Sequence, residues 1–102
     1  MLGIVIEYDF DGDEATWADA VETFVKAIDD DPRLRGRFSY QVNVRADGGG
    51  RIHVGRWDEE ETLAHLQSQD FFKTFAAKVQ EFGGDSLKAT RYKRLNGTSA
   101  RN

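Results

Sequence analysis

Apolar and polar residues alternate along four segments of the chain, which is the pattern of half-buried β-strands. Residues 2–10 carry Leu, Ile, Tyr and Phe at every second position, and "RFSYQVNVR" (37–45) alternates in the same way. The later segments "RIHVGRW" (51–57) and "SLKATRYKRL" (86–95) repeat this two-residue period. We therefore predict four strands.

Residues 14–31 instead repeat apolar side chains every three or four positions, as an amphipathic helix does. Asp13 is a good N-cap for this helix, because its carboxylate can accept hydrogen bonds from the free backbone amides of the first turn. Pro32 ends the helix, since proline lacks the backbone donor and disfavours helix in the residue before it. The apolar stripe consists of Trp17, Val21, Phe24, Val25 and Ile28.

A second helical pattern follows Asp58, which can cap it, with Glu61 in the N3 position of a capping box. The pattern continues to the glycine pair at 83–84. We expect a kink or a break at "SQD" (68–70), because Ser and Asp compete for helical backbone bonds and favour a new cap. The apolar positions are Leu63, Leu66, Phe71, Phe72, Phe75, Val79 and Phe82.

The order of these elements is βαββαβ. It predicts an α+β fold of the ferredoxin-like class, with a four-stranded antiparallel sheet and two helices on one face. The length of 102 residues fits one domain, which we place at residues 1–95. Residues 96–102 are expected to form a flexible C-terminal tail.

The glycines of "DGGG" (47–50) predict the turn of a hairpin between the two central segments. The length of this loop decides which side chains share a face, because a slip of one residue inverts a strand. An even loop places Val42 and Val44 on the face of His53, whereas an odd loop places them on the face of Ile52. The apolar pattern favours an odd loop, with a left-handed glycine forming a bulge.

With an odd loop, the sheet has one aliphatic and aromatic face and one mixed face. The mixed face carries Gln41, Asn43, His53, Trp57 and Tyr92. The two helices can cover only one face, and neither face is polar enough to lie in water. Because an exposed apolar sheet face usually marks an interface, we expect a homodimer that packs sheet against sheet.

Composition excludes several classes of partner. The chain has 18 Asp and Glu against 14 Lys and Arg, and this negative balance argues against a nucleic-acid partner. No apolar run approaches the roughly 20 residues that span a bilayer. The first ten residues lack a basic region and are interrupted by Glu7 and Asp9, so they do not resemble a signal peptide. We therefore expect a cytoplasmic protein with no membrane association.

Cysteine and histidine usage limits the chemistry further. The chain has no cysteine, which excludes disulfides, thiolate nucleophiles and cysteine-based metal sites. The two histidines, His53 and His65, lie twelve positions apart on a predicted strand and a predicted helix. Two such residues are a weak metal signal, and a third ligand would have to come from elsewhere. We expect no metal.

The most distinctive segment is the strand end at Trp57 together with "DEEETLAHLQSQDFFKTF" (58–75). The aromatic strand end, the acidic helix start and "HLQSQDF" (65–71) resemble the antibiotic biosynthesis monooxygenase domain of the dimeric α/β barrel superfamily. That resemblance implies a homodimer with its helices outside, and a pocket in each subunit between the helices and its own sheet. Some members oxidise phenolic, quinol or anthrone substrates with dioxygen and no cofactor. Others cleave haem, and many have no known reaction.

The resemblance also implies roles for individual residues. His53 stands where the cofactor-free oxygenases have an Asn that helps to stabilise the substrate anion. Trp57 would shape the pocket and exclude water, and His53, His65 or a bound water would be the base. The expected pocket side chains are Gln41, Asn43, Phe71, Phe72, Phe75 and Tyr92. The haem-cleaving branch resembles this chain less, because its Asn and His are replaced within "IEYDF" and "KTFAAK", so we expect no haem and no other cofactor.

Two functions follow as hypotheses. One is a cofactor-independent monooxygenase acting on a small phenolic, quinol or polyketide-like substrate with dioxygen. The alternative is a non-catalytic dimeric module that binds a small hydrophobic or aromatic ligand. Trp57 and the phenylalanines also fit an ordinary core, and both histidines fit structural roles. A hydrophobically lined pocket is common to both functions, so the sequence does not choose between them.

Overall fold

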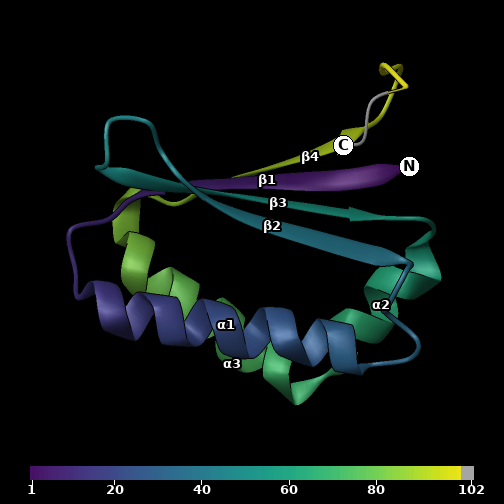
Figure 1. Cartoon of the computed structure of the whole chain (residues 1–102), viewed down its shortest axis with the longest axis horizontal. Helices are drawn as coiled ribbons and strands as arrows, with labels where there is room; N and C mark the ends of the chain where they lie inside the picture. Colours follow the sequence, from purple (N-terminus) through teal and green to yellow (C-terminus); the bar gives the residue numbers. More distant parts are fainter. Residues whose placement is uncertain (100–102) are drawn as a thin grey trace.

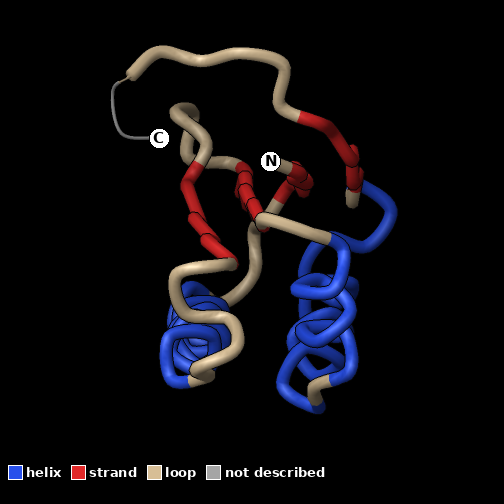
Figure 2. Tube along the Cα trace, turned by 90° about the vertical axis from the view of Figure 1, so that its right-hand side faces the viewer, coloured by secondary structure: helices blue, strands red, loops and turns tan. Residues whose placement is uncertain are grey.

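The computed structural model describes residues 1–99 and has the expected architecture of one antiparallel sheet covered by helices (Figure 1). The elements are β1 (Leu2–Asp9), α1 (Glu14–Asp30), β2 (Phe38–Val44), β3 (Gly50–Trp57), α2 (Glu60–Ser68), α3 (Asp70–Gly83), the 3₁₀ turn η1 (Gly84–Ser86) and β4 (Lys88–Lys93). The strand order is β2-β3-β1-β4. All helices lie on one side of the sheet, as the end view shows (Figure 2). The ferredoxin-like α+β prediction is confirmed.

The two ends of α1 form as the sequence predicts. The Asp13 carboxylate accepts a hydrogen bond from the backbone N–H of Thr16 at 2.9 Å. At the other end, α1 stops at Asp30, and Pro32 follows two residues later. The buried side chains of α1 are Trp17, Ala20, Phe24 and Ile28, which face the sheet and α3.

The expected break in the second helix is complete, so the chain has two helices, α2 and α3, in place of one. Gln69 between them is extended, with φ −82° and ψ 140°. The Ser68 hydroxyl donates to the backbone carbonyl of His65 at 2.6 Å, so the last turn of α2 is satisfied by a side chain. At the start of α2 the cap is Glu59, one residue later than expected, and Asp58 accepts from the Thr62 hydroxyl instead.

The hairpin register differs from the prediction. Val42 pairs with His53 and Val44 pairs with Arg51, in an uninterrupted ladder from Phe38 onward. The amide of Arg45 donates to the carbonyl of Gly50, which leaves a loop of even length. The odd-loop prediction is wrong, although a left-handed glycine is present at Gly48, with φ 80°.

The physical reason lies in β3. The prediction placed Ile52 and Val54 on one face with Val42 and Val44, because these are the aliphatic side chains of the two strands. In the structure the core side of β3 carries Arg51, His53 and Trp57, all of them buried. Both ring nitrogens of His53 are hydrogen-bonded, to Tyr8 and Tyr40. Arg51 pairs with Glu14 and donates to the carbonyl of Gly50, while its Nε has no partner among the described residues. These contacts offset much of the cost of burying the two polar side chains.

The two faces of the sheet are therefore composed differently from the prediction. His53 and Trp57 lie on the helix-covered face, together with Tyr40 and Val42. Gln41, Asn43 and Tyr92 lie on the opposite face, so the expected mixed face does not form. That outer face also carries the aliphatic side chains of Val5, Ile52 and Val54.

Substitution of Gly48 by alanine tests the loop geometry. An L-residue at φ 80° is strained, and we expect Gly48→Ala to lower the free energy of unfolding by about 1–2 kcal/mol. Gly49→Ala is the matched control, because a Cβ there meets its nearest atoms at 3.5 Å, an ordinary contact. Urea unfolding gives the free energy of unfolding of both variants. Equal decreases in Gly48→Ala and Gly49→Ala would contradict the assigned turn.

Two further expectations concern the C-terminal tail and membrane spans. Residues 94–98 form no helix or strand, and residues 100–102 of the expected tail lie outside the described residues. Within residues 1–99, no helix is long and apolar enough to cross a membrane.

Candidate functional site

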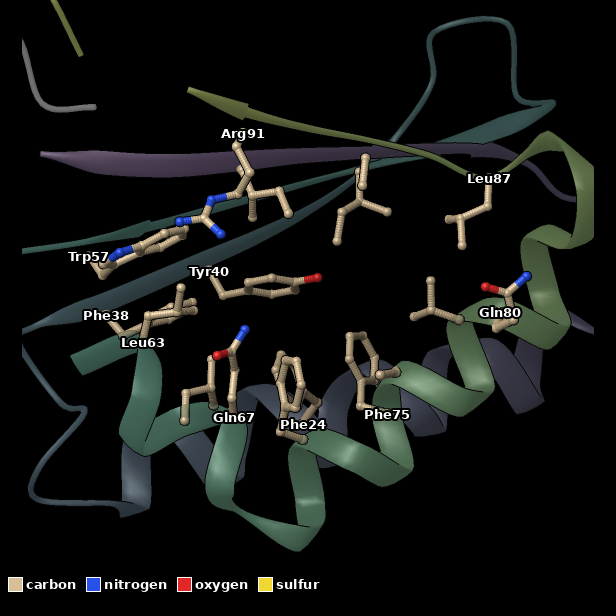
Figure 3. A pocket seen from close by; sticks show the side chains of 17 residues that line it. Phe24, Phe38, Tyr40, Trp57, Leu63, Gln67, Phe75, Gln80, Leu87 and Arg91 are labelled. Carbon is tan, nitrogen blue, oxygen red and sulfur yellow. The ribbon is translucent and has the colours of Figure 1, made fainter. Parts of the chain in front are cut away.

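An apolar cavity of about 270 Å³ lies between the sheet and the helices α2 and α3. In Figure 3, Tyr40 and Trp57 point into it from the sheet, and Phe24 and Phe75 point into it from the helices. The strands contribute Ile4, Ile6, Phe38, Tyr40, Trp57, Ala89 and Arg91. The helices and the segment before β4 contribute Phe24, Leu63, Leu66, Gln67, Phe72, Phe75, Ala76, Val79, Gln80 and Leu87.

Trp57 forms one end wall of this cavity. It is 1% exposed, and its ring stacks on Phe38 with centroids 5.6 Å apart and planes 2° apart. The Arg91 guanidinium carbon lies 5.1 Å from the centre of the Trp57 ring, within the range of a cation–π contact. The indole N–H of Trp57 has no hydrogen-bond partner among the described residues.

Arg91 brings positive charge to the edge of the cavity. About half of its side chain is exposed, and its nearest acidic partner is Glu60, at 3.8 Å. Both groups of that pair are well exposed, so the pairing is weak and leaves most of the charge of Arg91 available to a ligand. An oxyanion of a bound molecule is the complementary group.

His53 lies behind the cavity wall and does not line it. It is fully buried, and its Nδ1 is 2.7 Å from the hydroxyl of Tyr40, which does line the cavity. Its Nε2 is 2.8 Å from the Tyr8 hydroxyl, which in turn accepts a hydrogen bond from the Trp17 indole N–H at 2.8 Å. A continuous chain of hydrogen bonds thus runs from the cavity into the core.

Burial, and after it the charge of Arg51, lowers the pKa of His53 to about 4. Arg51 is itself buried, stacked against the rings of Phe10 and Trp17 and paired with Glu14. Histidine is therefore neutral at this position near pH 7. A general base works best when its pKa lies near the operating pH, so His53 is a poor direct base.

The hydroxyl of Tyr40 stays protonated. Burial raises its pKa well above the usual range, and the neighbouring Tyr8 hydroxyl adds to this effect. Burial likewise raises the pKa of Tyr8, although the hydrogen bond from Trp17 opposes the shift. Tyr40 therefore offers the cavity a neutral hydroxyl, which can donate or accept a hydrogen bond.

His65 lies away from this cavity. Its Nε2 is 2.8 Å from a carboxylate oxygen of Asp31, and both side chains are mostly buried. Burial raises the pKa of Asp31, but hydrogen bonds from His65 and from the amide of Arg33 outweigh it, so the net pKa is lowered. The pair joins α2 to the end of α1, beside a hollow with polar walls. This placement gives His65 a structural contact.

The other predicted pocket residues divide into two groups. Phe72 and Phe75 line the cavity, as expected. Phe71 instead borders a separate hollow between α1 and α3. Gln41, Asn43 and Tyr92 lie on the outer face of the sheet, on the other side from the cavity.

Tyr40 and Arg91 also line the cavity and were not predicted from the sequence. The signal for Tyr40 was its place on a strand two residues before Val42, which an even hairpin loop puts on the face of His53 and Trp57. Arg91 follows Ala89 at the same two-residue spacing on β4, and both point to the helices. As for metals, no group of three His, Cys, Asp or Glu side chains within residues 1–99 could hold an ion.

Fold and cavity together define a ferredoxin-like α+β protein with an apolar, ligand-sized site between its helices and its sheet. The sequence matches no protein-family model and no curated protein. Solved structures do match it, and several of them are described as antibiotic biosynthesis monooxygenases.

Three of these structures are informative. One described as an antibiotic biosynthesis monooxygenase has a TM-score of 0.71 at 14% identity, covering 94% of this chain and 100% of its own. SnoaB, a cofactor-independent oxygenase from Streptomyces nogalater, has a TM-score of 0.76 at 11% identity, covering 98% and 97%. A dimeric ferredoxin-like protein of unknown function from Jannaschia sp. CCS1 has a TM-score of 0.71 at 10% identity, covering 91% and 98%.

At these sequence identities the comparison shows a shared fold only, because proteins of one fold can have many different functions. The resemblance to the antibiotic biosynthesis monooxygenases that the sequence indicated is confirmed at that level. The roles of His53, Trp57 and His65 stay predictions.

Proposed function

We propose that the cavity binds a small, flat phenol, quinol or polyketide-like aromatic molecule, and that the protein oxygenates it with dioxygen without a cofactor. The observation that carries this proposal is an apolar cavity of about 270 Å³ with a neutral hydroxyl, Tyr40, in its wall and a guanidinium, Arg91, at its edge. The fold shared with SnoaB, a cofactor-independent oxygenase, supports it.

The size and the walls of the cavity suit fused aromatic rings. Its volume lies just below the range of about 300–1,000 Å³ that holds drug-sized ligands, so two or three fused rings are the matching size. Aromatic side chains form one end and the helix side of the space, with Trp57 and Phe38 stacked at one end and Phe75 meeting Tyr40 edge-on from the helices. Such walls favour offset or edge contacts with a bound ring.

The proposed chemistry starts from the substrate anion. The Tyr40 hydroxyl donates a hydrogen bond to the ionised oxygen, and the positive charge of Arg91 favours the anion. We assign removal of the proton to a water at the solvent-exposed edge, because His53 is buried and neutral. Dioxygen then reacts with the electron-rich carbon, one oxygen atom enters the product as a carbonyl, and the other leaves as water. The substrate supplies all the electrons, and Trp57 excludes solvent.

A second function is favoured by one specific observation. None of the described side chains that line the cavity is a His, Asp, Glu or Lys, so the lining holds no base with an ordinary pKa near 7. A dimeric module that binds an aromatic ligand without turnover needs no such base. The two functions therefore involve the same kind of aromatic ligand, and only the first includes a chemical reaction of that ligand.

Obstruction of the cavity tests both functions. Ala89 points to the helices from β4, opposite Ile6, so Ala89→Trp places a large ring in the cavity. We expect the affinity for aromatic ligands to fall at least about tenfold, a change of about 1.4 kcal/mol. Ala77→Trp, on an exposed part of α3 outside the cavity lining, should bind normally.

Calorimetric titration with hydroquinones and anthrones gives the affinities, and an oxygen electrode gives turnover. Uptake of dioxygen that Ala89→Trp abolishes and Ala77→Trp retains supports the oxygenase. Binding without uptake supports the binding module. The absence of binding to all of these compounds would refute both.

We also propose that the outer sheet face packs against a second copy of this chain. Val5, Ile52 and Val54 make that face partly apolar, and no helix of the described chain covers it. Gel filtration with light scattering should give about twice the chain mass of 11.5 kDa. Val54→Lys should shift the protein to the monomer, whereas Ala77→Lys on α3 should leave the dimer intact. A monomeric mass for the unmodified protein would refute the proposal.

A further inference from the structure

We infer that His53 fixes the Tyr40 hydroxyl as a hydrogen-bond donor to the cavity, so that the site selects a ligand oxygen that accepts. A quinone-type carbonyl or an ionised phenol oxygen has this property. His53 is then a positioning residue that determines specificity through Tyr40, in place of the base that the sequence suggested. The inference rests on the proposed function in one respect, which is that the cavity takes an aromatic ligand.

Three hydrogen-bond contacts join the side chains of Trp17, Tyr8, His53 and Tyr40. The Trp17 indole N–H donates to the Tyr8 hydroxyl at 2.8 Å, and that hydroxyl is 2.8 Å from His53 Nε2. His53 Nδ1 is 2.7 Å from the Tyr40 hydroxyl. With a neutral imidazole, each of the four groups brings one polar hydrogen. The three hydrogen bonds use three of these four hydrogens, so one hydrogen remains free to bond to another group.

The indole of Trp17 decides the direction of the first contact, because it can only donate. The Tyr8 oxygen therefore accepts there, and two arrangements of the rest are possible. In the first, Tyr8 donates to Nε2, Nδ1–H donates to Tyr40, and the spare hydrogen is that of Tyr40. In the second, Tyr40 donates to Nδ1, Nε2–H donates to Tyr8, and the spare hydrogen is that of Tyr8.

Burial separates these two arrangements. Tyr8 is 2% exposed and its hydroxyl already meets Trp17 and His53, so a spare hydrogen there would be a buried donor without an acceptor. A buried donor left unpaired is unfavourable by about 1–3 kcal/mol, which corresponds to a preference of about five- to 150-fold. The Tyr40 ring, by contrast, reaches into the cavity with its hydroxyl at the far end (Figure 3). The first arrangement is therefore favoured.

A protonated imidazole would undo this assignment, because both ring nitrogens would then donate. The surroundings of His53 oppose that state. The ring is fully buried among Tyr8, Tyr40 and Phe75, and the charged group nearest along its own strand is the guanidinium of Arg51. Burial and this positive charge both hold the pKa of His53 well below its ordinary value.

The consequence for ligands follows from Tyr40 and Arg91, which lie in the cavity lining together with the amides of Gln67 and Gln80 and the indole of Trp57. Tyr40 donates, and the guanidinium of Arg91 at the edge can only donate. A carbonyl or a phenolate oxygen accepts from both. A neutral phenol brings a further hydrogen, for which neither Tyr40 nor Arg91 is an acceptor, so it gains less from these two groups.

The tautomer can be measured without any ligand. The chain has two histidines, so a long-range ¹H–¹⁵N spectrum of histidine-labelled protein contains two ring systems, and His65→Gln identifies that of His53. We expect His53 at pH 7 to be neutral with its hydrogen on Nδ1. A hydrogen on Nε2, or a charged ring, would overturn the inference.

The ligand preference is measured with 1,4-naphthoquinone and naphthalene, which share a flat skeleton of two fused six-membered rings, whereas only the quinone carries oxygen acceptors. The chain has no cysteine that the quinone could alkylate. In calorimetric titration we expect Tyr40→Phe to weaken quinone binding about three- to tenfold and to leave naphthalene binding unchanged. An equal effect on both probes would overturn the assigned donor role.

The histidine spectrum and the titrations together distinguish a failure of the proposed function from a failure of the inference about Tyr40. If neither probe binds, the proposed function and the ligand preference both fall, while the spectrum still decides the tautomer. If both probes bind and the quinone has no advantage that depends on Tyr40, the proposed function survives and the inference fails.

Discussion

Replacement of Phe24 by alanine is expected to lower the free energy of unfolding by about 3–5 kcal/mol, the range for large buried aromatic side chains. Phe24 lies at the centre of the core and is 2% exposed. Its ring stacks on Phe75 at a centroid distance of 4.0 Å, with planes 3° apart, and meets the edge of Tyr40 at 5.1 Å. The substitution removes these contacts and enlarges the cavity that Phe24 lines.

Urea unfolding followed by tryptophan fluorescence measures this loss. Val44→Ala is the control, since Val44 is 56% exposed at the end of β2, and we expect a change within about 0.5 kcal/mol. Domains of this size have unfolding free energies of about 5–15 kcal/mol, so Phe24→Ala can leave little folded protein. Phe24→Leu keeps much of the volume and should lose clearly less. A loss below about 1 kcal/mol for Phe24→Ala would contradict the packing described for α1 and α3.

The second large effect concerns pH. His53 has its folded-state pKa lowered from 6.5 to about 4, chiefly by burial. As pH falls below 6.5, the unfolded chain binds a proton at this position and the folded chain does not. Stability is therefore complete above pH 6.5 and is lost progressively toward pH 4, at about 1.4 kcal/mol per unit. We expect a total of about 3 kcal/mol from this group.

Carboxylates titrate in part of the same range, so the test is a difference between variants. His53→Gln should lack this component, and its free energy of unfolding should fall less steeply between pH 6.5 and 4 than that of the unmodified protein. His65→Gln keeps His53 and should retain the component. Parallel pH profiles for the unmodified protein and His53→Gln would show that His53 is not held neutral.

The order and type of the elements could be predicted because local signals agreed with the fold. The Asp13 cap and Pro32 set the ends of α1, and the "SQD" segment marked the break between α2 and α3. These signals act over a few residues and need no knowledge of tertiary contacts. The expected strands differ from the observed ones by only a few residues at their ends.

The sheet register could not be predicted in the same way. A rule that gathers the aliphatic residues of neighbouring strands on one face fails at β3, where Ile52 and Val54 face outward and Arg51 and His53 face the core beside Val42. The partners that make this burial possible are Glu14, Tyr8 and Tyr40, which lie 13 to 45 positions away in sequence. Such long-range hydrogen bonds leave no periodic signal.

In the candidate site, too, local patterns placed some residues correctly and the register error misplaced others. Trp57, Phe72 and Phe75 were expected in the cavity wall and lie there, because strand-end and helix periodicity place them. Gln41 and Asn43 were assigned to the wrong side of the sheet through the register error. The same error concealed Tyr40, the hydroxyl that the inferred hydrogen-bond chain presents to the cavity.

The edge strand β4 has a consequence for how molecules reach the cavity. Among the described strands it pairs with β1 alone, over six residues, and most of its side chains are exposed. A strand held on one side opens at a lower free energy than β1 or β3, which are held on both. Since β4 carries Ala89 and Arg91 of the cavity lining, its local opening would uncover the site while the stacked core of α1 and α3 stays folded. Amide hydrogen exchange along β4 then reports cavity access directly, and a bound ligand should slow it.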